Sequence, residues 1–245
     1  MRERLQVGRF LRRYKRFFAD VERGSETLVT HCPNTGSMKT LLAEGVEAWF
    51  RTSDDPRRKL AHSLVLLGVP GGVALVDTAL PNRIVAEALE AEVVGSLAGY
   101  GSVRREVKVG EKSRIDVVLG DHREGRPDCY IEIKNVTMLS GETPDTVTAG
   151  RRRADFPDAV TSRGTRHLEE LMRLVDQGHR AVQLYFLGRT DCDRVGLAST
   201  IDPVYAETAR AAQARGVEFR AVALRAERGD EDWALTVGAE LPVVL

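Results

Sequence analysis

The sequence predicts a two-part fold, in which a small β-barrel is followed by an α/β sandwich with a mixed sheet. Up to about residue 80, several short strand-like runs alternate with closely spaced turns, which is typical of a small barrel. After residue 80, a helix, three strands, a helix, a strand, a helix and a strand follow in order, and this order favours an α/β sandwich. A chain of 245 residues has room for two modest domains. We therefore expect one domain over residues 1–80 and another over residues 81–245.

The first segment of the expected barrel, Val7 to Val21, is ambiguous between helix and strand. Its apolar residues follow i, i+3, i+4, i+7 spacing, which alone favours an amphipathic helix. The segment is also rich in aromatic residues and leads through the turn signal Glu22–Ser25 into the strand-like run Thr27–Thr30, which favours a strand. The other elements expected here are a polar turn and a short helix over residues 33–42, and strands over residues 46–52 and 60–69.

The second part begins after Pro81, where Asn82 is a suitable N-cap for a helix that reaches about Val94. Strands are expected over residues 103–109, 115–119, 130–136, 181–187 and 219–224, and helices over residues 165–177 and 206–215, the last closed by Gly216. Residues 140–153 show no periodicity and are expected to form a long polar loop.

Composition describes an ordinary globular protein, with 42% hydrophobic and 29% charged residues. No apolar run approaches the roughly 20 residues that span a bilayer, so no membrane partner is expected. Cys32, Cys129 and Cys192 are odd in number and far apart, which indicates a reducing cytoplasm rather than a disulfide framework or a zinc site.

The net charge is zero, but the basic residues are unevenly distributed. Residues 2–16 hold seven cations against the single acid Glu3, and two further basic clusters lie at residues 57–59 and 151–153. Each cluster alone is explained as readily by a solvated face. Three such clusters in a neutral chain favour a polyanionic partner mildly.

Two short apolar runs, Arg114–Leu119 and Tyr130–Lys134, carry the chemistry. Side chains alternate across a strand, so Glu132 and Lys134 share one face of the second run. Asp116 sits inside the first run, and the two strands are joined by a short polar connection. Charged groups are rarely buried without a partner. These groups therefore need one another, a metal ion or an anionic ligand.

The pattern predicts a catalytic set of Asp116, Glu132 and Lys134, with Mg²⁺ or Mn²⁺ as the cofactor. The two acids would bind the ion, with Glu87 as a candidate extra ligand, because Mg²⁺ prefers carboxylates, water and substrate phosphate. Lys134 would orient a water molecule or offset charge developing on phosphorus. The alternative is a cross-strand ion pair between Asp116 and Lys134 on a partly wet sheet.

A second pair of candidates lies near a helix start, where Arg163 and His167 are four residues apart. They could face one groove and contact nucleic acid, or they could equally point to solvent. In the N-terminal segment, phosphate contacts are expected from Arg12, Arg13, Lys15 and Arg16. Base stacking is expected from Tyr14 and Phe10, although either ring could belong to the core.

With these residues assembled, the chain closely resembles the sugar fermentation stimulation protein A (SfsA) family. The nine-residue run from Thr30 to Met38 is highly specific, and the matching stretches follow in order along nearly the whole chain. The other stretches are Arg12–Phe17, Arg58–Leu60, Ser113–Asp116, Glu132–Thr137, Phe156–Thr161, Arg163–Gly164, Ile201–Pro203 and Tyr205.

The resemblance implies an N-terminal OB-like barrel and a second domain similar to PD-(D/E)XK nucleases, with strand rather than helix over Val7 to Val21. It places Asp116, Glu132 and Lys134 at the positions of the nuclease-like motif. It also implies DNA binding and a regulatory role in sugar utilisation, particularly that of maltose. The segment between Thr137 and Phe156 departs from the family by being longer and more basic.

The function expected is that of a cytoplasmic DNA-binding protein with a nuclease-like metal site. One alternative is an active Mg²⁺- or Mn²⁺-dependent nuclease that uses Asp116, Glu132 and Lys134. Another is a transcriptional regulator with a vestigial site, although no helix-turn-helix signature is visible. A small-molecule binding module is the weakest alternative. Single- and double-stranded DNA both stay open as partners, and so does a homodimer.

Overall fold

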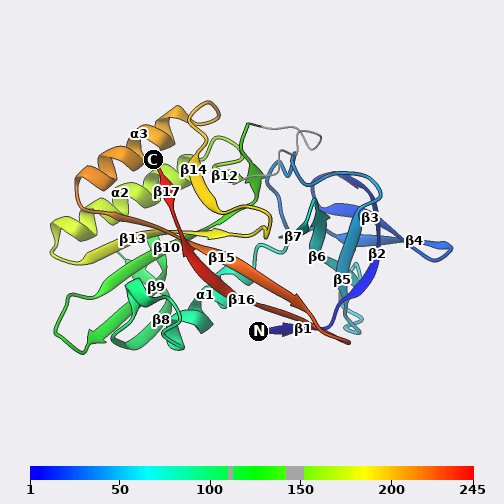
Figure 1. The fold of residues 1–245 in the computed structure, drawn as a ribbon, viewed down its shortest axis with the longest axis horizontal. Coiled ribbons are helices and arrows are strands. Elements are labelled where there is room, and N and C mark those ends of the chain that lie inside the picture. The colour runs from blue at the N-terminus through cyan, green and yellow to red at the C-terminus, as the bar shows by residue number, and fades with distance from the viewer. Residues whose placement is uncertain (110–112, 142–151) are drawn as a thin grey trace.

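The computed structural model describes residues 1–109, 113–141 and 152–245. These residues form a closed barrel and a mixed-sheet α/β domain that lie side by side, with the barrel at the right of Figure 1. Both parts of the predicted fold class are confirmed. Most of the loop expected over residues 140–153, including Arg151 of the third basic cluster, lies outside the described residues.

The barrel is built from strands β2 to β6, and β7 extends its sheet. The strands are β2 (Gln6–Tyr14), β3 (Phe18–Arg23), β4 (Glu26–His31), β5 (Glu47–Thr52), β6 (His62–Val69) and β7 (Gly72–Leu75). They run in the order β4-β3-β2-β5-β6-β7. A parallel pairing of β4 with β6 at Thr30 and His31 closes the barrel around buried side chains such as Phe10, Phe50 and Leu64.

The segment from Val7 to Val21 is strand, so the expectation drawn from the family resemblance is confirmed. Its helix-like spacing has two physical causes. The pairing of β2 with β3 shifts register between Phe10 and Arg12, which breaks the period of two. The strands then reverse in a turn at Lys15 and Arg16, whose φ angles are +46° and +63°.

The prediction of a short helix within residues 33–42 is wrong. All of this segment is described, and it holds turns, bends and irregular structure only. Met38 has a φ of +52°, which a right-handed helix cannot contain. The guanidinium of Arg13 also takes up local carbonyls, with Nη2 donating to Asn34 O (2.8 Å) and Nη1 to Gly36 O (3.0 Å). The loop is therefore held from the barrel side in an irregular conformation.

The α/β domain centres on a seven-stranded sheet with the order β1-β16-β15-β13-β10-β9-β8. Its middle strands β10, β13 and β15 are parallel, and the flanking pairs are antiparallel. The strands are β1 (Arg2–Glu3), β8 (Tyr100–Val109), β9 (Ser113–His122), β10 (Cys129–Val136), β13 (Arg180–Leu187), β15 (Glu218–Arg228) and β16 (Trp233–Leu241). The first strand of the chain thus belongs to the sheet of the second domain.

A smaller sheet has the order β11-β12-β14-β17. Its strands are β11 (Met138–Leu139), β12 (Arg153–Phe156), β14 (Arg194–Leu197) and β17 (Val243–Val244). The sequence did not indicate this sheet, because strands of two to four residues are too short to show an alternating pattern.

Three helices cover the large sheet, with α2 (Ser162–Asp176) and α3 (Pro203–Ala214) on one face and α1 (Leu80–Glu90) on the other (Figure 1). The 3₁₀ turn η1 (Gly95–Leu97) follows α1. Asp202 caps α3 by accepting from Tyr205 N at 2.9 Å. The prediction of Asn82 as N-cap of α1 is wrong. Ala79 holds that position, and Asn82 lies in the first turn with its amide directed to Asp116.

The two domains are joined through β7 and the segment that follows β13. Leu75 N donates to Gly188 O at 2.7 Å, and Thr190 N donates to Val73 O at 3.0 Å. Ser37 N donates to Asp158 Oδ2 at 2.8 Å, which links the loop after β4 to the segment after β12. Among the described helices, none is long and apolar enough to cross a membrane.

Candidate metal and nucleic-acid site

The two acids singled out by the sequence lie on neighbouring strands, Asp116 on β9 and Glu132 on β10. The antiparallel pairing of these strands reaches Val117 and Ile131, and the next residues in that register are Asp116 and Glu132. Directly opposite residues project to the same face of a sheet. Beyond this paired ladder, Asp116 Oδ2 accepts the Ile133 N–H at 2.7 Å, so a side chain bridges the two strands where the pairing ends. The two carboxyl groups therefore lie together, as the strand pattern predicted.

The Asp116 carboxyl group is held at both oxygens, since Oδ1 accepts from Asn82 Nδ2 at 2.8 Å. Burial raises its pKa from 3.8 to about 6, and the charge of Glu132 adds to the shift. The Ile133 amide, Lys134 and Asn82 oppose the shift without cancelling it. Asp116 thus carries a negative charge at neutral pH at a marked energetic cost.

Glu132 is almost fully buried, and its two carboxylate oxygens differ sharply. Oε1 accepts from Lys134 Nζ at 2.7 Å and contacts His167 Nδ1, whereas Oε2 has no hydrogen-bond partner among the described residues. Burial acts to raise the pKa of Glu132, but the hydrogen bonds and charges of His167 and Lys134 outweigh it and lower the pKa. The group stays ionised with one oxygen unused.

His167, on α2, completes the surroundings of Glu132. Arg163 Nε donates to His167 Nε2 at 3.3 Å, which leaves Nδ1 as the ring nitrogen that can donate to Glu132 Oε1. Lys134 Nζ lies 3.2 Å from the same Nδ1. The structure therefore brings His167 and Lys134 to one carboxylate oxygen, and His167 points inward rather than to solvent.

Gln183 is a site neighbour that sequence reasoning missed. It lies on β13 directly beside Glu132 in the parallel register, and Gln183 Nε2 donates to Glu132 O at 3.0 Å. The side chain is fully buried, and Oε1 has no partner among the described residues. The available signal was a polar residue inside the otherwise apolar run Ala181–Leu187.

A cleft of about 670 Å³ opens beside Asp116. Three arginines line it, Arg114 from β9 and Arg163 and Arg166 from the first turns of α2, together with His167. Arg114 and Arg166 were not singled out from the sequence, because isolated arginines carry no pattern. The lining thus combines two acids, Asp116 and Glu106, with these arginines, and such a mixed lining suits a phosphate-bearing ligand bound through a metal ion.

Glu87 is not part of this cluster. It lies on α1, where Oε2 pairs with the α-amino group of Met1 at 3.1 Å and Oε1 accepts from Arg83 at 3.0 Å. It lines a different cavity from Asp116, together with Met1 and Leu235. Asn82, five residues earlier on the same helix, is the residue that reaches Asp116. Within the described part of the chain, no group of three or more His, Cys, Asp or Glu side chains could enclose a metal.

The candidate nucleic-acid residues of the barrel fall into two groups. Arg12 pairs with Asp20 at 2.7 Å and lies over the ring of Tyr14, which stacks on Phe18. Phe10 is 1% exposed and belongs to the barrel core, so it cannot stack on a base.

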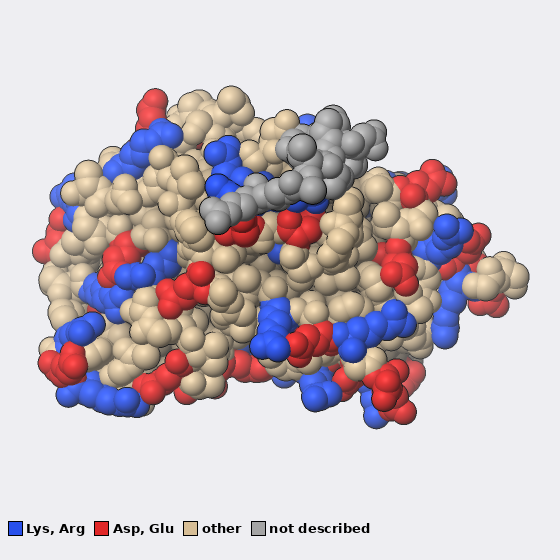
Figure 2. Space-filling model, in the orientation of Figure 1, with Lys and Arg blue, Asp and Glu red and all other residues tan. Residues whose placement is uncertain are grey.

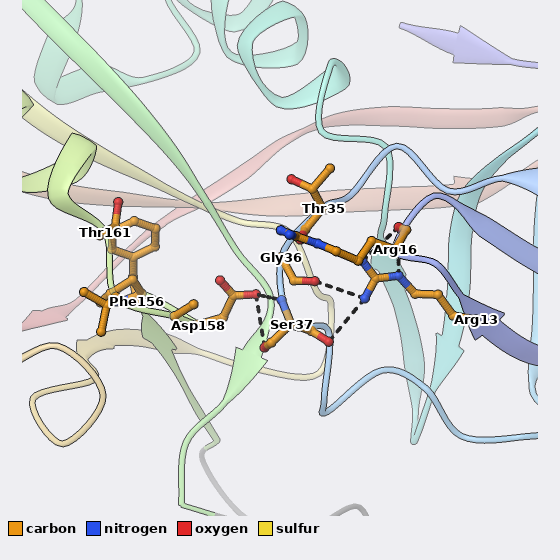
Figure 3. Close-up of a pocket in the computed structure, with 11 residues that line it drawn as sticks. Arg13, Arg16, Thr35, Gly36, Ser37, Phe156, Asp158 and Thr161 are labelled. Atoms are coloured by element: carbon orange, nitrogen blue, oxygen red, sulfur yellow. Dashed lines mark hydrogen bonds between the residues drawn. The ribbon is translucent and has the colours of Figure 1, made fainter.

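The turn between β2 and β3 carries the other group. Arg13 is fully engaged with loop carbonyls, whereas Lys15 and Arg16 are exposed. Arg13 and Arg16 line a second cavity between the barrel and the α/β domain (Figure 3). Figure 2 shows basic and acidic side chains interspersed over the visible face rather than one continuous basic surface. Any polyanion contact on that face would therefore be local.

The oxygen groups at and beneath the cleft suit a divalent cation. Glu132 Oε2 and Gln183 Oε1 are buried acceptors without partners among the described residues. In the sheet, Glu132 lies between Gln183 on β13 and Asp116 on β9, and of these three Asp116 lines the cleft. Oxygen ligands of this kind are those that Mg²⁺, Mn²⁺ and Ca²⁺ prefer. A cation would satisfy the unused acceptors and stabilise Asp116 in its charged form.

Comparison with known proteins decides the family. The family described as "Sugar fermentation stimulation protein RE domain" matches residues 79–230, and "SfsA N-terminal OB domain" matches residues 11–76. The chain belongs to the sugar fermentation stimulation protein family. The recognition from sequence motifs is therefore confirmed.

Sugar fermentation stimulation protein homologs are similar over nearly the full chain. The homolog from Geobacter metallireducens is 46% identical and covers 98% of this chain and 97% of its own length. The homolog from Dinoroseobacter shibae is 42% identical, with 98% and 93% covered. The solved structure of Pyrococcus furiosus SfsA in complex with Ca²⁺ superposes with a TM-score of 0.80 at 26% identity and covers 98% of this chain and 95% of that one.

Proposed function

We propose that this protein binds DNA through a divalent-metal site formed by Asp116 and Glu132, with Gln183 as a further oxygen ligand. The observation that carries the proposal is the buried, unpartnered Glu132 Oε2 beside a carboxylate whose pKa is raised to about 6. The Ca²⁺ complex of the Pyrococcus furiosus relative supports a divalent ion in this family, and for this chain we propose Mg²⁺ or Mn²⁺.

The chain's own residues have separate parts in this proposal. Asp116 and Glu132 hold the ion, while Lys134 and His167 fix Glu132 through Oε1 and leave Oε2 free for it. Arg114, Arg163 and Arg166 contact phosphates along the cleft, and the exposed cations of the barrel turn contact the backbone further along the strand.

An active nuclease is the second candidate, favoured by Lys134 beside the cleft acids. A bound Mg²⁺ would supply Lewis-acid activation of the phosphodiester. Lys134 Nζ, 2.7 Å from Glu132 Oε1, is positioned to offset charge on a phosphate held over the acids. The measurement is metal-dependent degradation of single-stranded DNA by purified protein. Loss of activity in Asp116→Asn would support cleavage at this site, and persistence would assign the activity elsewhere.

A calorimetric titration tests the metal site itself. Wild-type protein should bind Mn²⁺, more tightly with a single-stranded oligonucleotide present, and Glu132→Gln should weaken binding at least about ten-fold because a carboxylate ligand is lost. Glu170→Gln is the matched control, since Glu170 is another buried glutamate, on α2, paired with Arg173 outside the cleft. Equal Mn²⁺ affinity in wild type and Glu132→Gln would contradict the proposal.

The proposal extends to cellular context. The three cysteines are free, with Cys32 and Cys129 buried, which is compatible with a cytoplasmic protein. The family name refers to sugar fermentation, and from the family resemblance we propose a regulatory role in sugar utilisation, including that of maltose. A homodimer also stays a proposal, to be measured by sedimentation.

A further inference from the structure

The cavity between the two domains is separate from the metal cleft. It has a volume of about 560 Å³, within the range of about 300–1,000 Å³ typical of small-molecule sites. Arg16 and Thr35 enter from the barrel side, and the segment from Phe156 to Thr161 enters from the α/β side (Figure 3). Both sides belong to the sequence stretches that carry the family resemblance, yet neither contributes to the metal cleft.

The walls of this junction cavity are held rigidly. Arg13 donates to the carbonyls of Asn34, Gly36 and Arg16, and Ser37 donates from N and Oγ to Asp158 Oδ2 at 2.8 and 3.3 Å. A Cβ at Gly36 would lie 2.4 Å from Asp158 Oδ2, so only glycine allows this approach. The cavity is therefore preformed by contacts between the two domains.

Two charged groups in the cavity keep unused hydrogen-bonding capacity. Arg16 uses only Nη2, which donates to Thr35 O at 3.0 Å, and its Nε and Nη1 have no partner among the described residues. In Asp158, Oδ1 is likewise without a partner in the described part of the chain. A ligand here should therefore offer both an anionic acceptor and a donor.

The rest of the lining is apolar. Phe156, Pro157, Ala159 and Val160 form it, and the Val160 residue is 76% exposed. A valine so exposed at the rim of a cavity gains from contact with a flat apolar group. A phosphate, a flat ring and an exocyclic amino or sugar hydroxyl donor occur together in a nucleotide.

We propose that the junction cavity binds one nucleotide, with its phosphate on Arg16, its base against Val160 and Phe156, and a base or sugar donor on Asp158 Oδ1. The location favours a nucleotide of a bound strand. Thr161 lines the junction cavity, and Arg163, which follows it closely in sequence at the start of α2, lines the metal cleft. Because these two residues are close in the chain, a strand bound over the acids could extend to the junction cavity, and to this extent the proposal rests on the proposed function.

The test uses the full chain and two probes, deoxyadenosine monophosphate and a single-stranded octanucleotide carrying 2-aminopurine. The variants are Arg16→Asn, in which asparagine tolerates the positive φ, and Val160→Asp, which puts a charge at the exposed rim. Their controls are Arg23→Gln, on β3 of the same barrel, and Val93→Asp, another exposed valine that lines neither cavity. Chemical shifts and 2-aminopurine fluorescence report binding.

We expect at least about ten-fold weaker nucleotide binding in both variants and less than two-fold change in both controls. Weaker binding of both probes to the variants would show that the cavity holds a nucleotide of a bound strand. If wild type binds the monophosphate but not the octanucleotide, and the variants bind the monophosphate more weakly, the cavity holds a free nucleotide and the proposed function is rejected. Octanucleotide affinity and fluorescence that match wild type in both variants would overturn the junction proposal and leave the metal site standing. Failure of wild type to bind either probe would overturn it as well.

Discussion

Replacing Asp116 by asparagine should change how the stability of the protein depends on pH. The pKa of Asp116 is raised to about 6 in the folded protein, above the ordinary 3.8 of an aspartate. Between these two pH values the folded state holds the proton more tightly than the unfolded state. The contribution of Asp116 to the stability of the folded protein is therefore fully present below about pH 4 and is lost as the pH rises through about 6.

The size of this effect follows from the same two values. The difference between about 6 and 3.8, at about 1.36 kcal/mol for each pKa unit, corresponds to a loss of up to about 3 kcal/mol of unfolding free energy between pH 4 and pH 7. In Asp116→Asn this loss is absent. The variant also loses one of the two acceptors for Ile133 N and Asn82 Nδ2, which lowers stability by about 1 kcal/mol at every pH.

The assay is urea unfolding at a series of pH values from 4 to 8, without divalent metal. Fluorescence of Trp49 and Trp233 reports unfolding, because the two rings pack 5.1 Å apart in the core. The difference in unfolding free energy between wild type and Asp116→Asn should shift by up to about 3 kcal/mol in favour of the variant as the pH rises. Asp54→Asn, an exposed aspartate of the barrel, should follow wild type. Parallel pH curves for wild type and Asp116→Asn would refute the burial argument.

Three further outcomes follow from the same contacts. Lys134→Met should lower the unfolding free energy by about 3 kcal/mol in thermal melts at neutral pH, because it leaves the buried Glu132 charge with His167 alone; an unchanged melt would contradict this. Gly36→Ala should cost about 1–3 kcal/mol, since its Cβ would meet Asp158 Oδ2 at 2.4 Å, whereas a Cβ at Gly95 meets only Glu240 Oε1 at 3.9 Å, an ordinary contact, so Gly95→Ala should melt like wild type. DNA affinity measured by fluorescence anisotropy should fall at least about ten-fold between 50 and 200 mM salt, and a flat response would argue against phosphate contacts.

The core of the site could be predicted from sequence because it depends on local rules. Alternation placed Glu132 and Lys134 on one face, and a short connection made neighbours of β9 and β10, so Asp116 was expected beside Glu132. Glu87 was expected there as well, since it lies on the preceding helix. Its actual placement depends on how α1 is oriented over the sheet, and that orientation brings Asn82 to Asp116. Sequence spacing holds no information on that angle.

Other features escaped prediction because long-range contacts decide them. The pairing of Gln183 with Glu132 arises from the parallel register of β10 and β13, and β11, β12 and α2 lie between these two strands in the sequence. The loop after Pro33 reads locally as a helix start, but Arg13 from another strand takes its carbonyls. In both cases a residue remote in sequence supplies the deciding hydrogen bond.

The electrostatics of the cleft connect its parts into one argument. Two carboxylates lie together at the end of a strand ladder. Lys134 and His167 both contact Glu132, and both contact the same oxygen, Oε1. In the ligand-free protein, the energy would be lower if one of these two side chains contacted Glu132 and the other contacted Asp116. The arrangement instead leaves Glu132 Oε2 unused and the pKa of Asp116 raised. A divalent cation would remove both costs at once, and this is the physical argument for the proposed metal site.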